Sequence, residues 1–308
     1  MTQTLCPYSL LPLSSAVSND EHILPVALGA PASFTVRAHA EENSRLNDLI
    51  DEPTVTDPLV RFIAMTQGVV SRSGDVKALL EGTVDGTGEA VRATFSQAGL
   101  NLSFQAPVDK DSQGRVSGVR GFGDAARLLA QQIAANYAKK GITVELGDET
   151  SREKPRLNMQ LVGDMPLIRQ QLFKIAYLMT VRVFGDSAIS GASGITLRSA
   201  MYAKDEKELE ELGVQGAIFR PLPLGFARSA GHGEHAITCA YMTGTGLIVS
   251  VDLFGCFTLF TVTSAEGIEA DEGTGEVAVI NVATSKLTST PYLEALPAIV
   301  ASAFQAST

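Results

Sequence analysis

Tryptophan is absent from this chain of 308 residues, and cysteine occurs only three times, as Cys6, Cys239 and Cys256. Cysteines this few and this far apart do not make a disulfide framework, so their use indicates a reducing compartment. No stretch approaches the roughly 20 consecutive apolar residues that span a membrane. The N-terminal residues also lack the basic leader that precedes the apolar core of a secretory signal. We therefore expect a cytoplasmic protein that makes no membrane contact.

Basic residues are also scarce, with 24 lysines and arginines against 34 aspartates and glutamates and a formal net charge of −10. The imbalance is strong in residues 1–52, where two arginines stand against seven acidic side chains. Phosphate backbones are bound by lysine and arginine, so this composition argues against broad nucleic-acid affinity, although clustered carboxylates suit a metal site. One basic stretch supplies the candidate nucleic-acid-binding residues Arg152, Lys154, Arg156, Arg169 and Lys174. The alternative is that these charges only form the polar face of a helix.

The chain does contain a segregated set of strand-like and helix-like segments. Short apolar alternations between residues 66 and 122, and again from 234 to 262, predict strands joined by glycine-bearing turns. A helix is predicted over residues 125–140, and the clearest one follows Asp164, with an apolar stripe that ends at Gly185. Strands and helices in separate clusters favour an α+β fold over a repeated βαβ pattern. The remaining expected elements are a strand over 142–146, a helix over 204–212, a strand over 277–283 and a closing helix over 293–304.

Residues 21–47 concentrate polar side chains that can do chemistry. Glu21 and His22 are adjacent, and Asn43 and Asn47 are four residues apart in a helix-like segment, so the two amides share one helical face. A carboxylate and two amide oxygens suit a hard divalent cation, and the histidine is left as a base. We expect a metal-dependent site here, with Glu21, Asn43 and Asn47 as the ligands.

In this stretch the chain resembles the HNH endonuclease family. The usual pattern there is an Asp/Glu-His-Ile-Ile-Pro run, a Gly-Gly loop, a short strand, and a Cys-x-x-Cys-Asn sequence that opens a helix. Here Glu21-His22-Ile23-Leu24-Pro25, Gly29-Ala30 and Asn43 follow in that order. Upstream, Cys6-Pro7-Tyr8-Ser9 is similar to the leading Cys-x-x-Cys of the family.

The resemblance implies a small ββα-metal domain over residues 1–52, followed by an α+β domain over residues 53–308 that selects the target or controls access. It implies that His22 takes a proton from a water molecule, which then attacks a phosphodiester bond of DNA; nothing in the sequence excludes RNA. Asn43 would act beside His22 in catalysis. A divalent cation, Mg²⁺ first and Mn²⁺ or Ni²⁺ as alternatives, would steady the leaving oxygen. Bacterial domains of this kind often work in defence or mobile-element biology.

The chain departs from the family at the two Cys-x-x-Cys pairs that hold a structural zinc ion. Those places carry Cys6, Ser9, His39 and Glu42, and serine is a poor zinc ligand. We therefore expect no structural zinc, and we expect packing against the C-terminal part of the chain to replace it. The same losses leave a second interpretation open, in which the module is catalytically inactive and serves as a scaffold or binds a partner.

A separate pair of histidines lies in the run His232-Gly233-Glu234-His235. Two histidines with a glutamate between them can hold zinc, but Gly231 and Gly233 argue against the helical geometry of a His-Glu-x-x-His site. We expect a loop that enters a strand here.

Overall fold

The computed structural model describes residues 3–14, 16–71, 74–147, 156–218 and 225–305. The chain divides into two compact units, of which one is Met1–Val76 with Gly163–Thr308 and the other is Lys77–Val162. This division differs from the boundary at residue 52 that the sequence suggested, because the second unit is inserted into the first. Every strand pairing among the described residues is antiparallel, and the helices are not interleaved as βαβ crossovers, so the predicted α+β class is confirmed.

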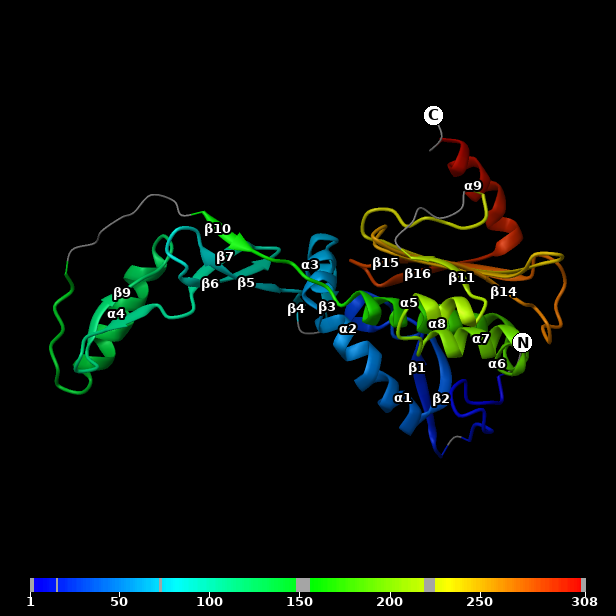
Figure 1. Cartoon of the computed structure of the whole chain (residues 1–308), viewed down its shortest axis with the longest axis horizontal. Coiled ribbons are helices and arrows are strands. Elements are labelled where there is room, and N and C mark those ends of the chain that lie inside the picture. The colour runs from blue at the N-terminus through cyan, green and yellow to red at the C-terminus, as the bar shows by residue number, and fades with distance from the viewer. Residues whose placement is uncertain (1–2, 15, 72–73, 148–155, 219–224, 306–308) are drawn as a thin grey trace. The chain divides into compact units, whose positions relative to one another are not determined.

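A six-stranded antiparallel sheet forms one layer of the first unit (Figure 1). Its strands lie in the order β11-β14-β13-β12-β15-β16, and helix α9 (Tyr292–Gln305) packs on it through Tyr292 and Ile299. The predicted strands over 234–262 and 277–283 and the closing helix are all formed. The bounds of the strands are β11 (Gln215–Ile218), β12 (Glu234–Met242), β13 (Gly246–Leu253), β14 (Phe257–Thr263), β15 (Gly275–Asn281) and β16 (Lys286–Pro291).

Helix α5 (Met165–Phe184) crosses this sheet and forms the middle layer of the first unit (Figure 1). The carboxylate of Asp164 accepts the N–H of Leu167 and so caps the helix, and Gly185 ends it with a φ of 60°. The predicted apolar stripe is buried, but most of the other faces of α5 are buried too. A helix buried all round needs cover on both sides. The sheet covers one side of α5. The N-terminal hairpin, formed by β1 (Ser18–His22) and β2 (Thr35–His39), covers the other.

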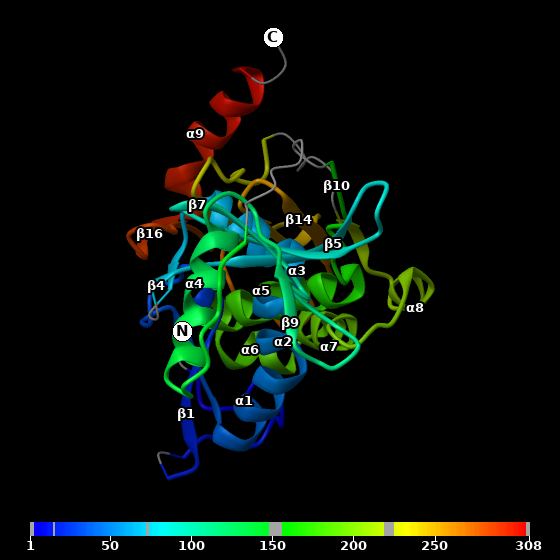
Figure 2. The same ribbon diagram turned by 90° about the vertical axis from the view of Figure 1, so that its left-hand side faces the viewer.

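Short helices come next after α5 in the chain. Figure 2 shows α6 (Asp186–Ser190) and α7 (Ala192–Ala200) beside α5, and both pack against it. Helix α8 (Glu206–Glu211) lies within the range predicted as a helix over 204–212.

The N-terminal segment begins with two strands, β1 and β2, joined through the turn η1 and followed by helix α1. Its apolar side chains Ile23, Phe34, Leu46 and Ile50 are fully buried in the same core as α5 and the sheet. This segment therefore belongs to the same compact unit as α5 and the sheet, and packing on α5 holds it in place. Its elements are β1 (Ser18–His22), the 3-10 turn η1 (Val26–Leu28), β2 (Thr35–His39), α1 (Ala40–Leu46), the π-helical turn η2 (Asn47–Asp51), α2 (Glu52–Thr56), α3 (Pro58–Thr66) and the short pair β3 (Val70–Ser71) and β4 (Gly74–Asp75).

The second unit has a four-stranded antiparallel sheet in the order β10-β5-β6-β7, a small β8-β9 ladder and one helix, α4. The strand predicted over residues 142–146 is wrong: no described strand pairs with this segment, and a strand needs a partner for its backbone groups. The bounds are β5 (Ala78–Val84), β6 (Ala90–Ser96), β7 (Gly99–Phe104), β8 (Val108–Lys110), β9 (Val116–Val119), α4 (Ala125–Ala138) and β10 (Leu157–Met159).

The three cysteines are unpaired; Cys6 and Cys239 are buried and Cys256 is exposed. Within the described ranges, the molecule has no helix with the length and apolar character needed to cross a bilayer.

Candidate functional site

The hairpin β1-β2 decides which side chains can meet. Its register pairs Glu21 with Val36 and Asp20 with Arg37. Because successive side chains of a strand point to opposite faces, Glu21 faces the core with Val36, whereas His22 shares the other face with Asp20. Burial follows this alternation, since Glu21 is buried, Asp20 is exposed and His22 is half-buried. The adjacent glutamate and histidine of the predicted site therefore point in different directions.

Glu21 belongs to a buried ion cluster with the ammonium of Lys174 from α5. The Lys174 Nζ lies 2.6 Å from Oε1 of Glu21 and 2.5 Å from Oδ2 of Asp51, which is on the turn η2. Lys174 is 0% exposed, Glu21 1% and Asp51 8%. Contacts between an ammonium and carboxylates are charge-assisted hydrogen bonds, which are stronger than those between neutral groups. The carboxylate predicted to hold a divalent cation is held instead by a lysine.

Burial and charge shift the pKa values of this cluster. Burial lowers the pKa of the Lys174 ammonium, but the carboxylates of Glu21 and Asp51 outweigh that effect, so its pKa lies above the ordinary lysine value. Lys174 therefore stays charged. Burial raises the pKa of Glu21, and the attraction of Lys174 offsets this only in part. Two carboxylates share one ammonium, so the cluster is neutral when Glu21 is protonated. A neutral cluster loses less hydration free energy on burial than a charged one.

The loop that precedes the hairpin is tied to the same cluster. The hydroxyl of Tyr8 donates to Oε1 of Glu21 at 2.8 Å, and burial raises the pKa of Tyr8 well above its ordinary value. The neighbouring carbonyl of Pro7 accepts the hydroxyl of Tyr177 on α5. That hydroxyl in turn accepts from Nη1 of Arg198 on α7 at 3.0 Å. The loop is thus fastened to two helices by polar contacts.

Asn43 and Asn47 do not converge. The Nδ2 of Asn43 donates to Oδ1 of Asn19 and to the backbone carbonyl of Asp20, both at 2.9 Å, so this side chain fastens α1 to the outer edge of β1. Asn47 is exposed, and its amide donates to Oδ1 of Asp48 at 3.3 Å. Helix α1 ends at Leu46 and the chain continues as a π-helical turn, so one α-helical face does not extend across both asparagines.

Three of the four residues at the zinc positions, Cys6, Ser9 and His39, are joined by hydrogen bonds. The Sγ of Cys6 accepts the backbone N–H of His39 at 3.4 Å. The Nε2 of His39 lies 3.1 Å from the carbonyl of Pro12, which can only accept, so this nitrogen carries the proton. In the neutral ring, Nδ1 then accepts from Oγ of Ser9 at 3.0 Å. Glu42 instead binds Nη2 of Arg45 at 2.8 Å.

The candidate nucleic-acid-binding residues do not form one exposed surface. Lys174 is fully buried, and Arg169 is buried with its Nη2 donating to the carbonyl of Ala203 at 3.3 Å. These two side chains cannot reach a phosphate backbone, which corrects the prediction made for them. Arg156 is exposed, but it belongs to the second unit. Arg152 and Lys154 lie outside the described residues.

Sequence reasoning missed Lys174, Asp51 and Tyr8 as members of the cluster around Glu21. One signal was present: Lys174 interrupts the apolar run of α5 between Phe173 and Ile175. A lysine in a buried position needs an acidic partner. The spacing of residues could not identify Asp51 as that partner, because it lies 123 residues away from Lys174 in the chain.

The histidines of the run 232–235 behave as expected, with a turn that leads into β12. His235 is fully buried, its Nε2 lies 2.8 Å from the carbonyl of Leu28, and its ring contacts that of Phe254. Burial lowers the pKa of His235 to about 4, so the ring is neutral at pH 7.

Over the described part of the chain, histidine, cysteine and acidic side chains nowhere gather in threes with the geometry of a metal site. Comparison of the chain with known protein families, with curated proteins and with solved structures gives no match.

Proposed function

We propose that the segment Ser18–Thr56 is a non-catalytic module of the HNH-like ββα type, which acts by binding a partner and not by cutting nucleic acid. One observation carries the proposal: the Lys174 ammonium lies between Glu21 and Asp51 and is bound to Glu21, the first of the predicted metal ligands. The residues present do not fit a bound divalent metal, because the first predicted ligand is already neutralised by a cation of the chain itself.

Access supports the same conclusion. A catalytic metal must touch both its protein ligands and the phosphate that it activates. Glu21 is 1% exposed, so a phosphate group cannot approach it without opening the core. The net charge of −10 adds long-range repulsion of a polyanion.

A metal-dependent DNA nuclease remains the second candidate, and one observation favours it. The order β1-β2-α1 is the arrangement that the resemblance implies, and Asn43 binds the backbone of Asp20, two residues from His22. In this alternative His22 is the general base, and Glu21 has to leave Lys174 before it can bind Mg²⁺.

Nuclease assays distinguish the two candidates. The full chain and its His22→Ala variant are incubated with supercoiled plasmid and with single-stranded DNA in Mg²⁺, Mn²⁺ or Ni²⁺. We expect both proteins to give the same background. Nicking by the parent that the variant lacks would overturn the non-catalytic proposal and favour the nuclease.

A metal-binding measurement gives an independent readout. Free Mn²⁺ is followed by electron paramagnetic resonance during titration of the full chain and of Glu21→Gln. We expect identical curves. A site in the parent that Glu21→Gln removes would contradict the proposal, whatever the nuclease assay gives.

A further inference from the structure

The outer edge of β2 presents backbone groups to a groove. In the hairpin, the backbone of Ile23 donates to Phe34 and that of Ala40 to Val17, so the even-numbered residues of β2 face β1. The N–H and C=O groups of Thr35, Arg37 and His39 therefore face away from β1, and of these the N–H of His39 donates to Sγ of Cys6. An outward row of this kind is a template for another strand.

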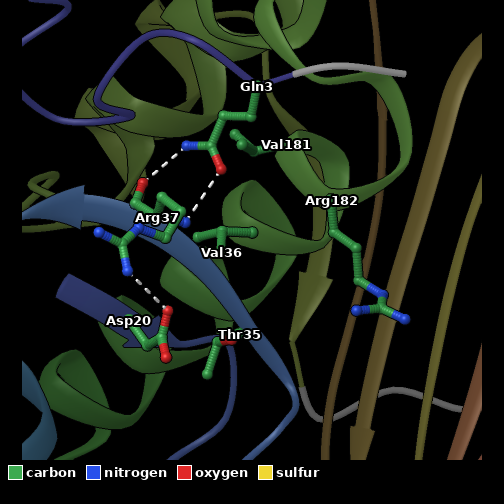
Figure 3. A pocket seen from close by; sticks show the side chains of 7 residues that line it. All are labelled: Gln3, Asp20, Thr35, Val36, Arg37, Val181 and Arg182. Atoms are coloured by element: carbon green, nitrogen blue, oxygen red, sulfur yellow. Dashed lines mark hydrogen bonds and ion pairs between the residues drawn. The ribbon is translucent and has the colours of Figure 1, made fainter. Parts of the chain in front are cut away.

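The side chain of Gln3 is bound to this edge in the way that a peptide group of an added strand would be. Its Oε1 accepts the N–H of Arg37 at 2.9 Å, and its Nε2 donates to the carbonyl of Arg37 at 2.6 Å (Figure 3). The next residues hold Gln3 there, because the N–H groups of Thr4 and Leu5 both donate to Oδ1 of Asp186 at 2.9 Å. Removal of the Gln3 amide would leave this anchor intact.

A groove of about 240 Å³ lies beside the edge. Figure 3 shows its lining, which combines the two valines with polar side chains. In a strand added along β2, alternate side chains would point toward the face of Val36 and toward the face of Arg37. The lining residues are Gln3, Asp20, Thr35, Val36, Arg37, Val181 and Arg182.

The charged side chains that line the groove indicate which kind of peptide strand would bind there. The lining holds two arginines and one aspartate. Arg182 is engaged, since its Nε donates to both carboxylate oxygens of Glu276 at 3.2 and 3.3 Å. Arg37 pairs with Asp20 at 3.2 Å, and its Nη2 donates to the carbonyl and to the hydroxyl of Ser18, both at 2.8 Å. The side chains of Arg37 and Asp20 are 44% and 63% exposed, so their ion pair is weak and can rearrange. The accessible cation is therefore on the Arg37 face.

We propose that the outer edge of β2 is a strand-addition site for an extended acidic peptide, and that the Gln3 amide occupies the site until such a peptide displaces it. The peptide places small apolar side chains into the groove on the Val36 face and carboxylates toward Arg37. The inference rests on the proposed function, because it names the partner of the non-catalytic module, but peptide binding and nuclease activity have separate readouts.

Fluorescence anisotropy tests the site with an acetylated, dye-labelled peptide that alternates valine and glutamate. Two control peptides alternate valine with lysine, or carry N-methyl groups on the amides that would pair with β2. We expect the glutamate peptide to bind the full chain, and the lysine and N-methyl peptides to bind at least about tenfold more weakly, since each lacks a required contact.

The Gln3→Ala variant tests the displacement step. Because it removes a competitor that makes two hydrogen bonds, we expect it to bind the glutamate peptide about tenfold more tightly than the parent. Gln113→Ala changes an exposed glutamine of the second unit and should match the parent. Equal binding of the N-methyl peptide, or equal affinity of Gln3→Ala and parent, would overturn the inference. Dimers of Gln3→Ala without peptide, measured by light scattering, would assign the edge to a second copy of the chain and overturn it as well.

Discussion

The ammonium of Lys174 lies 2.6 Å from the carboxylate of Glu21, and neither residue is more than 1% exposed. The contact joins the middle of α5 to the first strand of the hairpin. Asp51 completes the cluster from the turn after α1. The N-terminal segment is thus joined to α5 by charge as well as by apolar packing, and its acidic site is closed to solvent.

Replacement of Lys174 by methionine should destabilise the first unit by about 3–5 kcal/mol, because it leaves buried carboxylates without a cation. Urea unfolding followed by near-ultraviolet circular dichroism of tyrosine measures this change. The signal reports mainly the first unit, since Tyr137 is the one tyrosine of the six that lies in the second.

The triple variant Lys174→Met, Glu21→Gln, Asp51→Asn is the control. It removes all three charges, so most of the lost stability should return. If Lys174→Met alone costs less than about 1 kcal/mol, the cluster is not closed to solvent and the non-catalytic proposal loses its main support.

His235 should make the first unit acid-sensitive. Its pKa is about 4 in the folded protein against 6.5 ordinarily, so the unfolded chain binds the proton first as the pH falls. The stability contributed by the neutral ring is complete above about pH 6.5 and is lost as the pH drops toward 4; it amounts to about 3 kcal/mol. Urea unfolding between pH 7 and pH 4 measures the loss.

His235→Gln removes the titrating ring, so the fall in unfolding free energy over this range should be smaller by about 3 kcal/mol. His232→Gln changes the exposed histidine of the same run and should behave like the parent. The same fall in all three proteins would show that groups other than His235 cause it.

Asn43 and Asn47 offer a matched pair. Asn43→Ala should cost about 1–2 kcal/mol, because its amide makes two hydrogen bonds to β1. Asn47→Ala should stay within about 0.5 kcal/mol, since this side chain is exposed. Urea unfolding compares them directly. Two outcomes would support the predicted role of both asparagines as metal ligands. One is an equal loss of unfolding free energy in the two variants, and the other is Mn²⁺ binding that each substitution abolishes.

Ser9→Cys should create a metal site. The new thiolate would replace the hydroxyl that faces Nδ1 of His39, and Sγ of Cys6, which accepts the backbone N–H of His39, would be the second sulfur ligand. Titration with Co²⁺ should then give the absorption bands of thiolate-bound cobalt.

The parent and the double variant Ser9→Cys, His39→Ala are the controls for this titration. Neither should give the bands at comparable Co²⁺ concentration. Absence of the bands from Ser9→Cys itself would mean that the loop does not have the geometry of a zinc knuckle, which would weaken the resemblance to the HNH family.

Local patterns along the chain determined much of the fold. Helix α5 could be predicted from its apolar stripe, from the Asp164 cap and from the glycine at 185. Each of these signals depends on residues that are close together in the chain. Period-2 alternation identified β6, β7 and β12, whereas β11 and β16 of the large sheet were not predicted. The order of two strands and a helix at the N-terminus was an expectation from the resemblance to the HNH family and not from such local patterns. The strand predicted over 142–146 failed because alternation does not supply a pairing partner.

Tertiary structure alone decided what the polar residues do. The sequence placed Glu21 next to His22, but the pleat of β1 sends the two side chains to opposite faces. Lys174 read as a surface cation because its position in the helix reveals nothing of a carboxylate that lies far away in the chain. Its burial between Glu21 and Asp51 depends on α5 being covered on both sides, which is a property of the packed layers and of no single segment.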